Sequence, residues 1–166
     1  MDFDGRRPLT PTERAFLEAV YEKSLNTKLI DINPSFEKGQ PYSPMGNDIR
    51  LPIEMFHNED VRYMVVLSDS SIPSTLVHEA FHVWQRQHGQ WVTTRGLVRQ
   101  ALYKLGISDP YQYDVLSTGA EMLKQFKTAN VESQAQMFED GVTVMLSGNA
   151  STLSPYWDII NYVRNQ

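Results

Sequence analysis

The pattern of apolar and polar residues in the first half of the chain predicts one helix and a few short strands. Residues 11–24 carry apolar side chains at helical spacing after a capping-box sequence. Short apolar runs at 29–32 and 48–56 predict strands, and the alternation over 61–67 predicts the most regular strand of the chain. This order of elements indicates a small mixed or antiparallel sheet.

The second half of the chain has the periodicity of helices. Residues 72–88 present an apolar face and stop before Gly89, a residue that suits the position after a helix. Further helices are expected over 118–128 and 130–146, and another begins at Pro155. A few strands followed mostly by helices are typical of an α+β fold. We therefore expect one domain over residues 1–166.

Composition excludes several classes of function. The chain of 166 residues has a net charge of −5 and no run of Lys or Arg, so neither a nucleic acid nor an anionic membrane surface is an expected partner. It has no cysteine, which excludes disulfides and Cys-based zinc sites. The N-terminal segment lacks the apolar region of a signal peptide, and no apolar stretch could insert into a membrane. A cytoplasmic location in the producing cell is the expectation.

The candidate chemistry lies in the segment LVHEAFHVWQRQHG, which contains the pattern His-Glu-x-x-His. His78 and His82 are one helical turn apart, so both imidazoles can bind one Zn²⁺ ion. Glu79 is placed to act as a general base on water bound to the metal. The competing interpretation is an ordinary helix with two histidines on its solvated face, as in an interaction module that binds no metal.

The third metal ligand stays open on spacing alone. His88 lies ten residues after His78, but it falls beyond His82 along a continuous helix and off its face. A second helix offers Glu132, which would complete a set of two histidines and a glutamate, and also Glu139. Glu132 has an alternative explanation too, because an acidic side chain in the first helical turn is favoured by the helix dipole.

Four segments of the chain resemble a family of small bacterial HExxH domains that occur beside, or fused to, type VI secretion spike proteins. The matching motifs are Gly46–Ile49, Leu76–Gln85, Tyr111 with Tyr113, and Asn130–Ala135. The resemblance implies a zincin-like fold with a small sheet packed against the HExxH helix, and Glu132 as the third ligand. The chain departs from the family at Ser133, where a second glutamine is usual.

The same resemblance implies a function and partners. Most members of that family are assigned as metallopeptidases, so a zinc-dependent hydrolase that cleaves a peptide or protein amide bond is expected. A toxin-like effector role would bring in a secretion-spike protein or a cognate immunity protein, and delivery to the periplasm of a target cell. The alternative is a catalytically inactive zinc-binding or adaptor module that docks on a secretion protein.

Two tyrosines are candidates for the remaining catalytic role. A phenol near the metal could donate a hydrogen bond to the oxyanion of a tetrahedral intermediate. Tyr111 and Tyr113 are both available, and Tyr113 is taken as the predicted catalytic residue beside Glu79. The competing interpretation is that both are aromatic packing residues.

Overall fold

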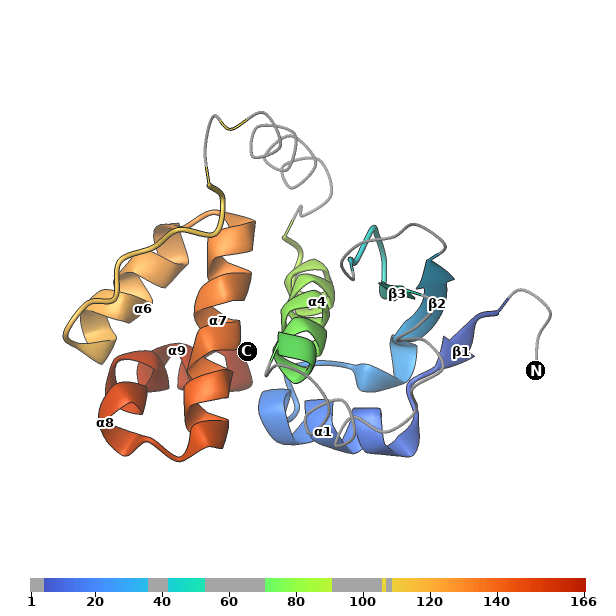
Figure 1. Cartoon of the computed structure of the whole chain (residues 1–166), viewed down its shortest axis with the longest axis horizontal. Helices are drawn as coiled ribbons and strands as arrows, with labels where there is room; N and C mark the ends of the chain where they lie inside the picture. Colours follow the sequence, from blue (N-terminus) through green and yellow to red (C-terminus); the bar gives the residue numbers. More distant parts are fainter. Residues whose placement is uncertain (1–4, 36–41, 53–70, 91–105, 107–108) are drawn as a thin grey trace.

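A computed structural model describes residues 5–35, 42–52, 71–90, 106 and 109–166 of the chain (Figure 1). In this part of the chain a small sheet and the first helix lie on one side of a central helix, and the later helices lie on its other side. The α+β prediction is thus confirmed. The predicted strand at 61–67 falls outside the described residues.

The first helix, α1, spans Pro11–Tyr21. Its predicted capping box is present: the Thr10 side chain accepts from the Glu13 backbone, and the Glu13 side chain accepts from the Thr10 backbone. Glu13 is buried and also binds Arg7, with a distance of 2.8 Å between Nη1 and Oε2. This arrangement fixes the start of the helix to the N-terminal strand. The helix ends three residues earlier than the predicted 24, where Glu22 adopts a positive φ of 54°.

The sheet is small and mixed. Strand β1 (Arg7–Pro8) runs antiparallel to β2 (Asp31–Ser35), and β2 runs parallel to β3 (Asp48–Pro52). The predicted strand at 29–32 therefore begins later, because a 3₁₀ turn, η1, occupies Thr27–Leu29.

Strand β2 continues through Pro34 to Ser35, although the predicted strand stopped at residue 32. Strand β1 pairs only with Asp31 and Ile32. From Asn33 onward, β3 is the only described strand that pairs with β2, so Pro34 lies where β2 has a free edge among the described strands. Proline lacks a backbone N–H group and is tolerated at such an edge.

Two long helices form the centre of the molecule. Helix α4 spans Ser71–Gln87 and α7 spans Val131–Ser147, and they pack side by side (Figure 1). Both agree with their predicted bounds to within one or two residues. An aromatic core lies where α1, α4 and α7 meet: the Phe138 ring is 5.0 Å from that of Tyr21 and 5.1 Å from that of Phe81, between centroids. The Tyr21 hydroxyl donates to the Val77 carbonyl at 2.6 Å, directly before the HExxH motif.

The remaining helices cover the outer side of α7. Helix α6 spans Gly119–Thr128, and the C-terminal segment contains α8 (Ala150–Leu153), η2 (Ser154–Tyr156) and α9 (Trp157–Arg164). The predicted C-terminal helix thus starts at Trp157. In η2, Tyr156 lies against Gly141 of α7 so closely that a Cβ atom at that glycine would be 3.0 Å from the Tyr156 Cβ. Among the described residues, no helix is both long and apolar enough to cross a bilayer.

Candidate metal centre

The two helices at the centre of the molecule bring the predicted ligands together. His78 and His82 lie on α4, with ring centroids 4.9 Å apart, and Glu132 lies in the first turn of α7. The Glu132 Oε2 atom is 3.5 Å from His78 Nε2 and 3.2 Å from His82 Nε2. All three side chains are buried, between 4% and 8% exposed.

These separations fit a tetrahedral metal ion. Bonds of about 2.0–2.1 Å at tetrahedral angles place neighbouring ligand atoms roughly 3.3–3.4 Å apart. The two nitrogen-to-oxygen distances fall on either side of that value. The three residues offer ligand atoms that all lie within 4.8 Å of one another, so the cluster can hold a metal ion.

The Nδ1 atom of each histidine is held by a different partner. The Nδ1 atom of His78 is 2.9 Å from Oε2 of Glu139, so a proton on Nδ1 is donated to that carboxylate. Glu139 and Glu132 lie two helical turns apart on α7, and they therefore contact opposite nitrogens of the same ring. Glu139, a rival for third ligand on spacing, orients His78 instead, as carboxylates commonly do for metal-bound histidines.

His82 is oriented by a chain of amide groups. Gln85 Nε2 donates to the Val131 carbonyl at 3.2 Å and to Gln134 Oε1 at 2.9 Å. The Gln85 Oε1 atom therefore faces Nδ1 of His82, at 2.9 Å, and accepts a hydrogen bond from it. Gln134 in turn donates to the Phe126 carbonyl. Both rings thus direct Nε2 at the cluster, where a neutral ring presents its lone pair.

The other candidate ligand, His88, has a different role. Its ring stacks on Trp84 with centroids 4.4 Å apart, and its Nδ1 atom lies 2.8 Å from the Trp84 carbonyl. The His88 side chain therefore contacts the same Trp84 carbonyl to which its own backbone N–H donates, in the last turn of α4. This agrees with its prediction as a residue of the helix C-terminus.

Glu79 is buried beside the candidate ligands. It is 6% exposed, and among the described residues its Oε2 atom has no hydrogen-bond partner. Burial raises the pKa of Glu79, and His82 and His78 partly oppose that rise. A buried carboxylate oxygen without a donor is costly, so a donor such as a water molecule held at the cluster fits this position.

The charges of the cluster are coupled. Burial alone would lower the pKa of His78, but hydrogen bonds to Glu132 and Glu139 outweigh it and raise the pKa to about 10. Burial alone would raise the pKa of Glu132, but His78 and His82 hold it well below its usual range. Without a metal ion, both ring nitrogens of His78 thus carry a proton at neutral pH, and the ring is positively charged.

Metal binding should therefore release a proton. A bound His78 must be neutral, so near pH 7 we expect about one proton to leave for each ion bound, and the apparent affinity to rise about tenfold per pH unit up to about pH 9. The affinity should level off above about pH 10. Calorimetric titration of the metal-free protein with zinc, in buffers of different ionisation enthalpy, measures the proton count. A heat of binding that is the same in all buffers would contradict this.

The two candidate tyrosines have different surroundings. The Tyr113 hydroxyl donates to Asp140 Oδ2 at 2.5 Å and lies 2.9 Å from the Tyr156 hydroxyl. This hydroxyl links the 109–118 segment to α7 and η2, and the catalytic role of Tyr113 stays a prediction. The Tyr111 ring lies beside His78, with centroids 6.0 Å apart.

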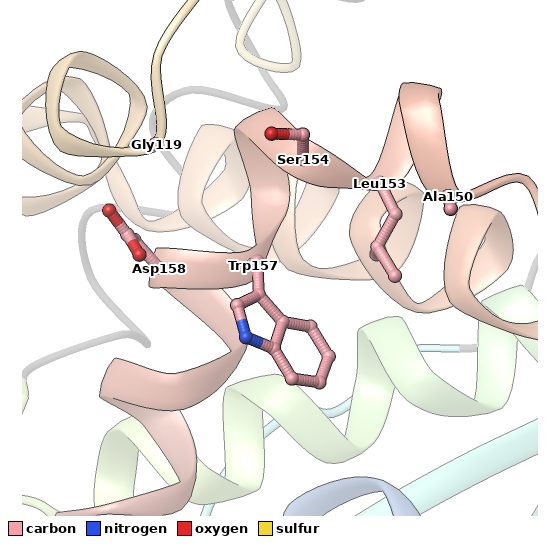
Figure 2. A pocket seen from close by; sticks show the side chains of 6 residues that line it. All are labelled: Gly119, Ala150, Leu153, Ser154, Trp157 and Asp158. Carbon is pink, nitrogen blue, oxygen red and sulfur yellow. The ribbon is translucent and has the colours of Figure 1, made fainter.

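A pocket elsewhere on the molecule is lined by none of the candidate ligands and by neither Glu79 nor the two candidate tyrosines (Figure 2). In Figure 2 the Asp158 carboxylate is directed toward Gly119, while the Trp157 ring points away from it. A Cβ atom at Gly119 would fall 2.6 Å from Asp158 Oδ2, so this carboxylate packs against the start of α6. The metal cluster is therefore the stronger candidate site. The pocket is lined by Gly119, Ala150, Leu153, Ser154, Trp157 and Asp158.

These features define an α+β domain with a buried cluster of two histidines and one glutamate that can hold a metal ion. No protein-family model matches the sequence, and the comparison with curated proteins gives no match. Among solved structures, the fold is similar to that of the effector domain of Pseudomonas aeruginosa VgrG2b, with a TM-score of 0.65. The two chains are 24% identical, and the match covers 88% of this chain and 79% of the other.

Proposed function

We propose that this protein is a zinc-dependent peptidase of the zincin type that acts as a secreted effector. The observation that carries the proposal is the Oε2 atom of Glu79, which is buried beside His78, His82 and Glu132 and has no partner in the part of the chain that the structure describes. Two imidazoles and one carboxylate form a donor set typical of catalytic zinc, which keeps a fourth position for water or substrate. A purely structural site would instead need a fourth protein ligand.

The residues of the cluster would divide the work of amide hydrolysis. When bound, zinc lowers the pKa of a coordinated water toward about 7 and polarises the carbonyl group of the substrate. Glu79 accepts a proton from the attacking water as the water oxygen bonds to the carbonyl carbon. Glu79 then delivers this proton to the nitrogen of the leaving amine when the carbon–nitrogen bond breaks. Its raised pKa favours this exchange, because the carboxyl group can hold the proton between the two steps.

The effector role rests on two similarities. The motifs of the sequence resemble HExxH domains found with type VI secretion spike proteins, and the fold is similar to an effector domain. On this basis we propose a secretion-spike protein and a cognate immunity protein as partners, and delivery to the periplasm of a target cell. A peptide or protein is the proposed substrate.

The proposal is tested on the purified chain by metal analysis and a peptidase assay. We expect one zinc ion per chain, hydrolysis of unfolded casein or of a peptide library, loss of hydrolysis with a chelator, and recovery when zinc is added back. Zinc binding without hydrolysis of any peptide substrate would favour the inactive zinc-binding module. A chain that binds no zinc would contradict the whole proposal.

A further inference from the structure

The segment before α6 is anchored to the same helical turn that supplies Glu132. The buried Ser133 hydroxyl donates to the Pro110 carbonyl at 2.7 Å and lies 3.2 Å from the Gln112 carbonyl. Asn130 caps α7 with its Oδ1 atom and donates from Nδ2 to the Ser133 hydroxyl at 2.7 Å. The side chain that departs from the family motif thus fixes residues 110–112 in position.

This anchor determines where the two neighbouring tyrosines lie. Tyr113 is tied to Asp140 through its hydroxyl, and Gln136 supports that carboxylate by donating to Oδ1 at 2.9 Å. Tyr111 directly follows Pro110. Its half-buried ring is tilted by 52° to the His78 ring, at a centroid distance of 6.0 Å. One tyrosine therefore tethers the segment, and the other borders a metal ligand.

We propose that Tyr111 is a substrate-contacting residue and that Ser133 positions it; this inference rests on the proposed peptidase function. A peptide whose carbonyl group reaches the Nε2 side of the cluster passes beside the His78 ring, which the Tyr111 ring borders. An aromatic ring with a hydroxyl offers a peptide both an apolar face and a hydrogen-bonding group. Ser133 directly follows Glu132 and bonds the backbone of residues 110–112. The proposed ligand Glu132 and the segment that carries Tyr111 therefore keep a fixed distance from each other.

The test compares two metal-binding probes on the zinc-loaded full chain. Acetohydroxamate reaches only the metal, whereas benzyloxycarbonyl-prolyl-leucyl-glycyl hydroxamate carries the same group on a peptide. We expect Tyr111→Ala to weaken binding of the peptide probe about tenfold and to leave that of acetohydroxamate within twofold. Tyr162→Phe, at a tyrosine of α9 whose ring contacts Phe126 and Lys127, should change neither affinity by more than about threefold. Thermal unfolding of each variant checks that it is folded.

Ser133 is tested with a matched pair of variants on the same helix. Ser133→Ala removes the anchor, and Ser147→Ala removes a hydroxyl that donates to the Val144 carbonyl of its own helix. We expect Ser133→Ala to weaken the peptide probe at least threefold with zinc affinity retained, and Ser147→Ala to change nothing.

The outcomes separate this inference from the proposed function. Tighter binding of the peptide probe than of acetohydroxamate by the wild-type chain, with no change in Tyr111→Ala, would show that only the present inference is wrong. A chain that binds no zinc, or that binds the peptide probe no more tightly than acetohydroxamate, would overturn both. A selective loss in Tyr111→Ala supports the contact, since a general loss of structure would weaken both probes.

Discussion

Replacing Glu79 with Gln should leave zinc bound while hydrolysis falls by about 10²- to 10⁴-fold, the usual contribution of a general base. The Glu79 carboxylate is buried, is not one of the three candidate ligands, and has an oxygen without a partner among the residues that the structure places. Glutamine keeps the shape and one carbonyl oxygen, but it cannot take a proton from water. The measurement is the rate of peptide hydrolysis at equal zinc content, with zinc determined on the same samples.

The control for this variant is Glu121→Gln, an exposed glutamate in the first turn of α6. It makes the same chemical change and should retain full activity. Unchanged hydrolysis in Glu79→Gln would rule out the proposed mechanism, even if the protein binds zinc. Loss of zinc in that variant would instead make Glu79 part of the metal-binding set.

Replacing Glu132 with Gln should cost more zinc affinity than the same change at Glu139. Glu132 approaches Nε2 of both histidines, whereas Glu139 contacts only Nδ1 of His78. Loss of an outer partner of a metal ligand typically costs about 10- to 100-fold in affinity. Glu139→Gln should fall in that range, and Glu132→Gln should exceed it. Competition with a chromophoric chelator measures both affinities.

The order of the two affinities decides which carboxylate binds the metal. A larger loss in Glu139→Gln would make Glu139 the ligand and Glu132 the outer partner. Glu139→Gln can still accept a hydrogen bond from His78 through its amide oxygen, so its remaining affinity should also exceed that of Glu139→Ala. Equal loss in all three variants would mean that neither glutamate has a separate role.

The sequence predicted the local part of the site because that part depends on helix periodicity alone. His78 and His82 are one turn apart in any helix, and an amphipathic pattern with Gly89 at its end predicted that helix to within one residue. The third ligand depends on how α4 packs against α7, which periodicity does not describe. Spacing therefore left Glu132, His88 and Glu139 as alternatives, and the resemblance to HExxH domains favoured Glu132.

The supporting residues were missed for the same reason. Gln85 appeared only as the last residue of the matched motif Leu76–Gln85, yet it orients His82 and reaches α7. Ser133 appeared only as a departure from the family motif, yet it fixes the segment at Pro110. A usable signal was present for Gln85, because it lies three residues after His82 and so shares its helix face.

The short elements were predicted less well than the long ones. Leu29 belongs to an apolar run, but it is 53% exposed and lies in η1 instead of a strand. The four-residue helix α8 and the turn η2 precede α9, and η2 contains Pro155, where the predicted helix began. These elements have too few residues for their periodicity to be recognised.

The close approach of Gly141 to Tyr156 limits the size of the side chain that position 141 can carry, and this limit affects other parts of the fold. A larger side chain at position 141 would contact Tyr156 too closely and displace η2 from α7. The Tyr156 hydroxyl would then draw back from Tyr113, although position 141 does not belong to the 109–118 segment. Relatives that keep this three-way junction should therefore carry a minimal side chain at 141, and a bulky one there should accompany a rebuilt C-terminus.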